Sequence, residues 1–452
     1  MAISRVFDIA RRSLAVYQRS LDVSSHNIAN ASNTDYSRQR AVLTSDIPEA
    51  VNGFVWGSGV KIADVQRARD TLLDKQIINY NQKYSSNDKE SLMLSQIEQV
   101  FAEPGEQGLS NTLDQFFNTW HELSVSPNSI PLRNSVINIA QSISTRIKGI
   151  RGDLDIVKSD TVNDFRVKVN SLNGLLKDIQ SFNARVYEAN AKGLEANDLM
   201  DQRDKAIDDL SKLVNISVSY DNHNVANVSI GGVFAVDASY ATEFDYTVNN
   251  SQLNLVTVND QKTAKINGGE LNALTEIYNN VIPSYVNDID AIANKLVEKV
   301  NALHKTGYSI TDPPKTGINF FDGYVNGELV INKDIISDPK MIAVSADGTD
   351  GNSEIAVKLG ELSDEKVLDG LTFSEKYTTL VSKIGTDKQT VDQLMDSNKL
   401  VLDQLENQKS SYSGVSVDEE MTNILTYQRA YQASAKMVQI ADQMIQSLID
   451  MV

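Results

Sequence analysis

The sequence contains no cysteine, and this absence removes several kinds of chemistry at once. Disulfide bonds, thiolate metal sites and cysteine nucleophiles are all excluded. Histidine is also scarce, with four residues among 452. The histidines at positions 26, 121, 223 and 304 match no metal-ligand spacing, so we interpret them as isolated packing or surface groups. We therefore expect neither a metal site nor a cofactor.

Long apolar runs and an excess of positive charge are missing as well. No run of about 18 apolar residues exists, so no segment is expected to insert into a membrane. The formal net charge is −18, which disfavours nucleic acid as a partner because phosphate backbones are bound by clustered lysine and arginine. The first residues contain no apolar core of a cleavable signal peptide, so any export is expected to use a route without such a signal.

A catalytic constellation is also absent from the sequence. Gly57-Ser58-Gly59 lacks the further glycine and the lysine of a phosphate-binding loop, so it is interpreted as a turn. The polar segment 347–354 does not follow the calcium-loop pattern and is interpreted as a cap for the next helix. Together with the missing nucleophile elbow, these observations predict that the protein is not an enzyme.

Apolar residues are abundant at helical spacing at the two ends of the chain. Each end is predicted to be a helix with one apolar face, which cannot bury that face alone. Such a chain is typical of an assembly subunit, although an ordinary intramolecular core remains an alternative. The candidate interface residues are Ile3, Phe7, Leu14, Tyr17, Leu21 and Ile28 in the first helix and Val417, Ile424, Tyr431, Val438, Ile445 and Val452 in the last.

The charges of the two ends favour pairing of these helices with each other. Residues 1–40 have a net charge of +3 and residues 413–452 a net charge of −3. Opposite charges attract, and burying two apolar stripes against each other removes both from water. The sequence therefore predicts a paired N- and C-terminal coiled coil.

The middle of the chain predicts a mainly α fold with a β-rich insert. Helical spacing runs from about Asp64 to Gln99, resumes at about 110 and continues to about 213, and returns at 270–304, where Pro283 is expected to kink or divide the helix. Alternation around residues 216–258 predicts strands, including a hairpin across Gly231-Gly232. This nesting predicts an elongated multidomain molecule with both termini at one end. The expected domains are a terminal coiled-coil assembly domain (1–40 and 413–452), a helical-bundle domain (41–213, 270–305 and 351–412) and one outer β domain (214–269 and 306–350).

Several motifs resemble those of bacterial flagellar axial proteins. The segment 27–39, from Asn27-Ile28-Ala29-Asn30 to Tyr36-Ser37-Arg38-Gln39, is similar to the signature that follows their first helix. The segments 413–421 and 427–436 resemble their C-terminal tail. Residues 109–127, 268–271 and 300–308, with Phe320-Phe321, are similar to the flagellar hook-associated protein 1 family in particular. The resemblance covers essentially the whole chain.

This resemblance implies a structural subunit of the junction between the flagellar hook and filament, located outside the cell. It implies a ring of identical subunits with hook protein below and a second hook-associated protein above. It also implies export through the flagellar type III apparatus, with a cytoplasmic chaperone on the C-terminal helix.

Two alternatives remain open from the sequence. A hook or distal rod protein would share the terminal motifs but not the central ones. An intracellular coiled-coil adaptor would explain the apolar stripes and acidity, but not the specific motifs.

Overall fold

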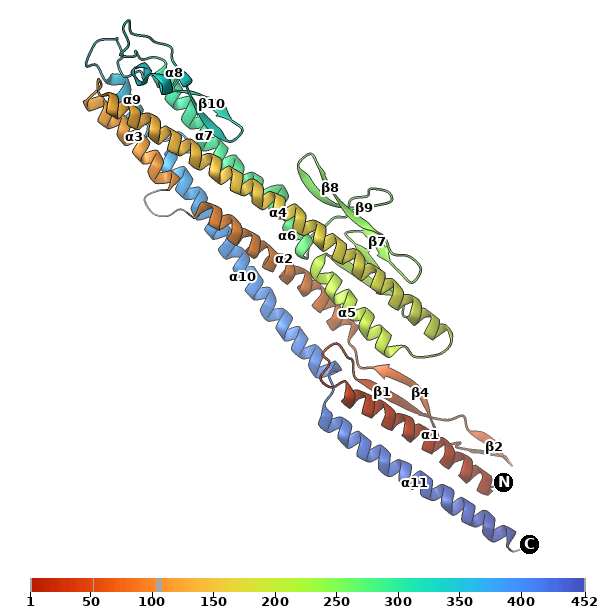
Figure 1. Ribbon diagram of the computed structural model, residues 1–452. Coiled ribbons are helices and arrows are strands. Elements are labelled where there is room, and N and C mark those ends of the chain that lie inside the picture. Colours follow the sequence, from red (N-terminus) through yellow and green to blue (C-terminus); the bar gives the residue numbers. More distant parts are fainter. Residues whose placement is uncertain (1, 52, 103–107, 451–452) are drawn as a thin grey trace.

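The computed structural model describes residues 2–51, 53–102 and 108–450 and shows an elongated molecule (Figure 1). Three long helices form much of its length: α2 (Thr71–Phe101), α4 (Ile130–Ala191) and α10 (Phe373–Ser413). The 62 residues of α4 correspond to a length of about 93 Å at 1.5 Å per residue. Both chain ends lie at the same end of the molecule, as the nested pattern predicted.

Polar side chains fix where the long helices begin. The Asp70 carboxylate accepts hydrogen bonds from the first-turn amides of α2, and Ser129 does the same for α4. Thr372 and Glu375 form a reciprocal capping box at the start of α10. The start of α2 corrects the expected helix at Asp64, because that residue lies in a strand that extends to Arg67.

The remaining helices of the body pack along the three long ones. They are α3 (Leu109–Val125), α5 (Asn197–Leu213), α6 (Glu270–Glu276) and α7 (Ile282–His304). A π-helical segment, Ile277–Val281, separates α6 from α7, and Pro283 lies in the first turn of α7. Proline lacks an amide hydrogen and its ring crowds the preceding turn, so a wider turn accommodates it. The predicted irregularity at Pro283 is confirmed.

The strands of the body occur in separate small antiparallel sheets. One sheet has the order β5 (Ile216–Tyr220), β6 (Ala226–Ile230), β7 (Val233–Val236), and β8 (Phe244–Asn249) pairs with β9 (Gln252–Thr257). Ile230 pairs with Val233 across Gly231-Gly232, which confirms the predicted hairpin. Both glycines have positive φ, 55° and 82°, which their missing side chains allow.

A further hairpin lies at the end of the molecule opposite the termini (Figure 1). It consists of β10 (Phe321–Val325) and β11 (Glu328–Ile331) and is followed by α8 (Lys333–Ser337), a 3-10 turn (Pro339–Met341) and α9 (Glu354–Glu361). The segments 214–269 and 306–350 were expected to form one β domain. The structure places them at two separate positions along α4 and pairs no strand of one with a strand of the other among the residues it describes.

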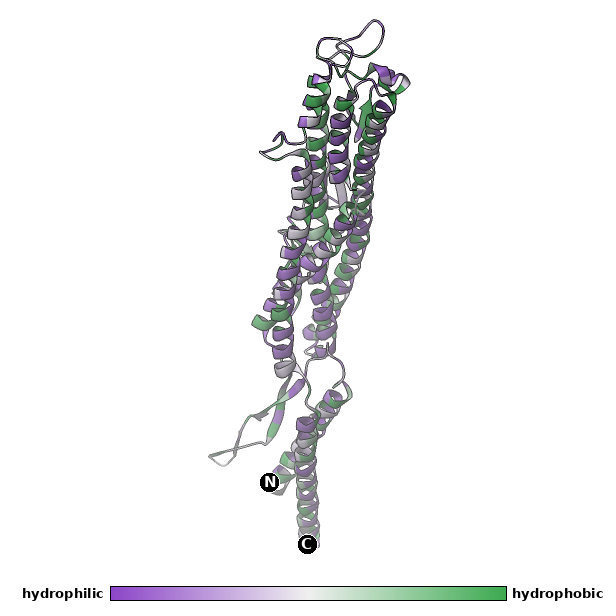
Figure 2. Cartoon of the chain, turned by 90° about the vertical axis from the view of Figure 1, so that its left-hand side faces the viewer, coloured by the Kyte–Doolittle hydropathy of each residue, from purple (hydrophilic) through white to green (hydrophobic). Residues whose placement is uncertain are grey.

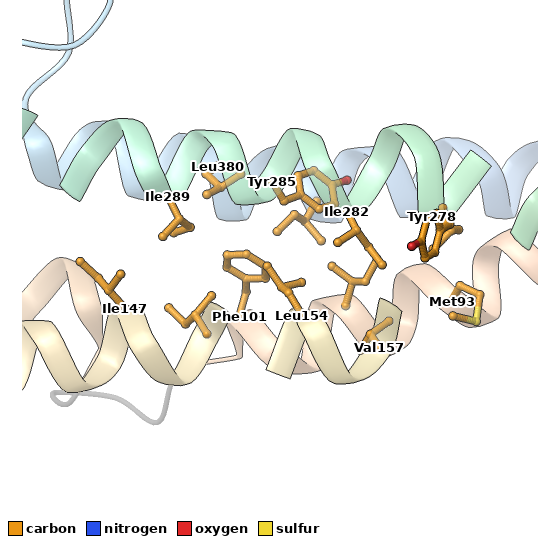
Figure 3. Close-up of a cluster of buried hydrophobic side chains, with 14 of the residues drawn as sticks. Met93, Phe101, Ile147, Leu154, Val157, Tyr278, Ile282, Tyr285, Ile289 and Leu380 are labelled. Atoms are coloured by element: carbon orange, nitrogen blue, oxygen red, sulfur yellow. The ribbon is translucent and has the colours of Figure 1, made fainter. Parts of the chain in front are cut away.

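One apolar core runs through the helical body. Figure 3 shows side chains from α2, α4, α7 and α10 that meet in it, among them Phe101, Leu154, Ile289 and Leu380. Figure 2 shows apolar and polar residues interleaved along the long helices, the pattern of helices with one buried face. No helix of the described chain is long and apolar enough to cross a bilayer.

The terminal module consists of α1 (Ala2–Ala29), α11 (Val417–Ile449) and four strands between α1 and α2. These strands are β1 (Gln39–Ser45), β2 (Glu49–Val51), β3 (Phe54–Trp56) and β4 (Val60–Arg67), with β1 paired to β4 and β2 paired to β3. Helix α1 packs on α11 and also on β1 and β4. The strands therefore belong with the terminal helices and not with the helical body, to which residues 41–67 had been assigned.

Candidate assembly surface

Helices α1 and α11 lie side by side in opposite directions, and small or polar residues of α11 form the centre of their contact. Among the α11 residues whose burial is described, Glu420, Ser434 and Ala441 are buried, and they repeat at multiples of seven residues. Tyr427 lies on the same line and stacks on Tyr17, with ring centroids 6.5 Å apart. We call this line the seam. Ser434 and Ala441 are its small members, and side chains of that size leave room for the facing helix.

The predicted interface residues border the seam instead of forming its centre. On α11 they lie three or four positions from the seam residues and therefore flank them on the same side of the helix. Leu14, Tyr17, Leu21, Ile28, Ile424 and Val438 are half-buried, whereas Phe7, Val417, Tyr431 and Ile445 are exposed. Ile3 lies within α1, and Val452 lies outside the described residues. The exposed members are available to another molecule, so their interface role stays a prediction.

Helix α11 exposes more apolar side chains than the sequence analysis selected. Their chemistry is that of a core, but they face solvent in the single chain. Exposed apolar patches of this kind usually mark protein interaction sites. The additional exposed residues are Met421, Leu425, Met437, Ile440, Met444 and Ile449.

The β2–β3 hairpin is a second exposed apolar feature, and the sequence analysis missed it. Ile47, Phe54, Val55 and Trp56 are all exposed. Alternation was not a usable signal here, because Phe54, Val55 and Trp56 are consecutive and all three face solvent. The available signal was the composition, since three consecutive large apolar residues beside a glycine turn are unusual in a solvent-facing hairpin.

Arg38 ties the strand side of the terminal module to the start of α11. Its guanidinium nitrogens lie 2.8 Å from a Glu419 carboxylate oxygen and 2.7 Å from one of Glu420. Its backbone amide also donates to the carbonyl of Ser413, the last residue of α10, at 2.8 Å. Arg38 therefore joins the segment after α1 to the end of α10 and the start of α11, which are far from it in the sequence.

A network of acids and arginines connects the terminal module to α5 of the helical body. The Asp201 carboxylate accepts hydrogen bonds from the Ser37 hydroxyl at 2.7 Å and from Arg67 at 2.7 Å. The Asp204 carboxylate pairs with Arg67, Arg69 and Arg203. These contacts fix the position of the terminal module relative to the rod-like body.

Two acids of α5 have pKa values that are shifted in opposite directions. Burial alone would raise the pKa of Asp204, but the charges of Arg203, Arg69 and Arg67 outweigh it and lower that pKa below the usual value. Burial raises the pKa of Asp208, and the charges of Lys409 and Arg69 offset this effect only in part. Asp204 is therefore held in its charged form, whereas Asp208 is more readily protonated than an ordinary aspartate.

A polar cleft of about 710 Å³ lies beside this network, between the loop after α1 and the end of α10. Arginine, lysine and carboxylate side chains line it in mixed order, without the nucleophile–base pairing of an acyl-transfer site. Across the described chain, no group of three or more His, Asp or Glu residues is placed to hold a metal ion. The cleft is best described as part of the joint between the module and the body.

His304 is fully buried at the C-terminal end of α7 and is part of the apolar core there. Its Nδ1 donates to the carbonyl of Ile318 at 2.7 Å, and its Nε2 accepts from the amide of Ala343 at 2.9 Å. The ring packs against Trp120 and Phe320. Burial lowers the pKa of His304 to about 4, so the ring is neutral at pH 7 and acts as a structural connector.

Comparison with known protein families gives one match in the helical body and one at the C-terminal end of the chain. Residues 94–321 match the family described as the helical domain of flagellar hook-associated protein FlgK. Residues 407–451 match the C-terminal family of the flagellar basal body rod FlgEFG proteins.

Individual proteins agree with these matches. The flagellar hook-associated protein 1 of Bacillus subtilis (strain 168) is 29% identical, over 98% of this chain and 97% of that protein. The protein of the same name from Escherichia coli (strain K12) is 22% identical, over 99% of this chain and 100% of that protein. The solved structure of the flagellar hook junction protein FlgK from Burkholderia pseudomallei shares the fold, with a TM-score of 0.65 and 12% identity. It covers 75% of this chain and 100% of that one.

Proposed function

The chain belongs to the FlgK family of flagellar hook-associated proteins, and from that premise we propose that it is a structural subunit of the junction between the bacterial flagellar hook and filament. The protein is located in the flagellum, where it assembles with the other axial components. The family is structural, and the assembly contacts are made by the terminal helices.

The observation that carries this proposal is the apolar surface of the terminal module. Phe7, Val417, Tyr431 and Ile445 face solvent at the end of the molecule where both termini lie. A large apolar side chain left in water costs roughly 1.5–3 kcal/mol relative to full burial. Contact with neighbouring subunits removes this cost, and the residues that border the seam are placed to make it.

The elongated shape supports a layered assembly. The terminal modules pack against one another and form the inner wall of a tube, and the helical bodies form the next layer out. The sheets β5–β9 and the distal hairpin are then furthest from the axis. The subunits form a ring, with hook protein on one side and a second hook-associated protein on the other.

The same surface suits a chaperone before export. The exposed residues of α11 need cover in the cytoplasm, and an amphipathic helix is commonly bound in an apolar groove. The C-terminal helix is therefore the expected chaperone contact, and export is expected to proceed through the flagellar type III apparatus.

Residues 1–35 and 415–452 are expected to be mobile in the free subunit and to become ordered on assembly. Much of the apolar surface of α11 gains a partner only in the ring, so isolated pairing with α1 recovers part of the available free energy. Amide hydrogen exchange of the purified chain tests this expectation. Protection of α1 and α11 equal to that of α4 would contradict it.

The decisive test uses a strain that lacks the gene and carries the wild-type or the Ile445→Asp chain. The wild type is expected to restore filaments on hooks. Ile445→Asp is expected to leave the melting temperature of the monomer unchanged while flagellin is lost to the medium. Val325→Asp, at an exposed apolar residue at the opposite end of the molecule, is the matched control and should support filaments.

Two results would contradict the proposal. Missing hooks in the deletion strain would assign the protein to the rod or hook, the nearest alternative. The match to the rod family is restricted to residues 407–451, whereas the match to the FlgK helical domain supports the junction. Unfolding of the Ile445→Asp monomer would assign the stripe to an intramolecular core.

A further inference from the structure

The β2–β3 hairpin exposes more of its apolar side chains than a free surface would favour. The exposed fractions are 75% for Ile47, 68% for Phe54, 74% for Val55 and 50% for Trp56. Figure 2 shows the hairpin extending sideways from the two terminal helices. A two-stranded hairpin of this length is not stable in water by itself. The hairpin therefore needs contacts that hold it to the rest of the chain and a partner that buries its apolar side chains.

The contacts that hold the hairpin to the rest of the chain lie at its base. The Asp46 carboxylate pairs with Arg12 of α1, and the Asp46 amide donates to the carbonyl of Gly59 at 2.9 Å. The Arg5 guanidinium lies 5.2 Å from the centre of the Trp56 ring. These contacts hold the hairpin beside the N-terminal end of α1. Phe54 contacts the edge of the Trp56 ring, and both side chains and Val55 still remain exposed.

The order of layers in the terminal module keeps the hairpin away from α11 of its own chain. α1 packs on α11 with one side and on β1 and β4 with another, so it separates the two. The module therefore presents two apolar outer faces: the hairpin tip, and the exposed residues of α11. Side-by-side packing of two copies brings the hairpin of one to the α11 of the next.

The position of the hairpin along the terminal module determines which part of α11 in a neighbouring copy lies at the same level. The start of α11 is tied to Arg38, beyond the end of α1, and Tyr427 stacks on Tyr17 in the middle of α1. The antiparallel arrangement then places the C-terminal half of α11 beside the N-terminal half of α1, level with the hairpin. Met437, Ile440 and Met444 are exposed there at a spacing that puts them on one helix face.

Charge favours the same arrangement. Residues 1–69, which contain α1 and all four strands, carry nine basic and six acidic side chains, a net charge of +3. Residues 413–452 carry two basic and five acidic side chains, a net charge of −3. A contact between the strand side of one copy and the α11 side of the next joins opposite charges, whereas like sides would repel each other.

We propose that the β2–β3 hairpin is an intersubunit clasp whose Phe54, Val55 and Trp56 pack on Met437, Ile440 and Met444 of a second copy of this chain. The proposal rests on the junction role and adds a specific contact to it. The contact is head-to-tail, so each copy donates one hairpin and receives another, as a ring requires. The thioethers of Met437 and Met444 suit aromatic partners, because sulfur packs favourably at ring edges.

The absence of cysteine allows a direct test in assembled flagella. Val55→Cys and Ile440→Cys chains, each with a different tag, are produced together in the deletion strain and treated with a short thiol-specific crosslinker. A product that carries both tags is expected, and it can arise only between two copies. Val325→Cys with Ile440→Cys is the matched control, because Val325 is exposed but distant, and it should give no such product.

Three results would overturn the clasp. The first is the absence of the doubly tagged product from filaments that assemble normally, also when Phe54→Cys replaces Val55→Cys. The second is a product between the hairpin and a protein of another mass, which would make hook or filament protein the occupant. The third is equal crosslinking by the Val325 control.

A charge in the hairpin gives an independent measure. Val55→Asp is expected to weaken association between copies by about tenfold or more, which corresponds to 1.4 kcal/mol. The melting temperature of the monomer should be unchanged, because Val55 is exposed in the single chain. Full assembly by Val55→Asp would overturn the clasp but not the junction role. Failure of the wild-type gene to restore filaments would instead overturn the junction role.

Discussion

The Arg38 guanidinium lies 2.7 Å from the buried carboxylate of Glu420, and this pair connects the segment after α1 to the first turn of α11. Glu420 is 2% exposed, so its charge depends on Arg38 for compensation. The two residues are 382 positions apart in the sequence. One ion pair thus holds the two ends of the chain in register.

The first prediction concerns this pair. Arg38→Ala and Glu420→Ala are each expected to destabilise the pairing of α1 with α11, and a double-mutant cycle should give a coupling free energy of about 1–3 kcal/mol. Removing one partner leaves the other without compensation. Amide hydrogen exchange in α1 and α11 of assembled flagella, where both helices are expected to be ordered, provides the measurement. Asp403→Ala removes the exposed Lys399–Asp403 pair and should change stability by no more than about 0.5 kcal/mol.

The second prediction is an opposite pH dependence for Asp204 and Asp208. The lowered pKa of Asp204 means that the unfolded chain binds more protons, so its contribution to stability is present above the usual value near 3.8 and is lost as the pH falls through the folded pKa. The raised pKa of Asp208 means that the folded chain binds more protons, so stability gains as the pH falls through its folded pKa.

Urea unfolding between pH 7 and pH 3 measures both effects. The stability difference between the wild type and Asp204→Asn should shrink towards acid pH. The difference between the wild type and Asp208→Asn should change with the opposite sign. The two acids are on the same helix, so each variant is the control of the other. Parallel slopes would contradict the assigned environments.

The third prediction concerns His304. Its folded pKa of about 4 lies below the usual 6.5, so its contribution to stability is fully present above pH 6.5 and is lost as the pH falls towards 4. The loss should approach about 3 kcal/mol. His304→Gln should abolish this part of the pH dependence in urea unfolding. His26→Gln, at an exposed histidine, should leave it in place.

The fourth prediction uses two glycines. Gly269 has φ of +79°, and a Cβ there would lie 2.4 Å from the amide nitrogen of Val214, so Gly269→Ala is expected to destabilise the chain by several kcal/mol. Gly149 lies within α4 with open space around it, and Gly149→Ala should stabilise the chain by about 0.5–1 kcal/mol. Thermal unfolding measures both. A mild effect at Gly269 would mean that the backbone there can move.

The sequence predicted the elements with strong local signals. The terminal helices follow from apolar spacing, and the break at Ser413-Gly414 separates α10 from α11 as expected. The hairpin at Gly231-Gly232 was predicted from the requirement for positive φ. These signals depend on residues that are close together in the sequence, so they can be recognised without knowledge of the tertiary structure.

The candidate interface was predicted less completely. The predicted apolar stripe is present on α11. The seam beside it contains Glu420, Ser434 and Ala441, which give no hydrophobic signal in the sequence. The hairpin residues Phe54, Val55 and Trp56 were missed because the alternation expected of a half-buried strand is absent where no face is buried.

The sequence by itself determined the helical periods, the charge of each end and the resemblance to an axial family, because all of these depend on residues close together in the chain. The tertiary structure decided how distant segments combine. It placed residues 214–269 and 306–350 at different positions along α4, and it assigned the strands after α1 to the terminal module. Such choices depend on which apolar faces meet and which charges are paired, and residue spacing along the chain does not specify either.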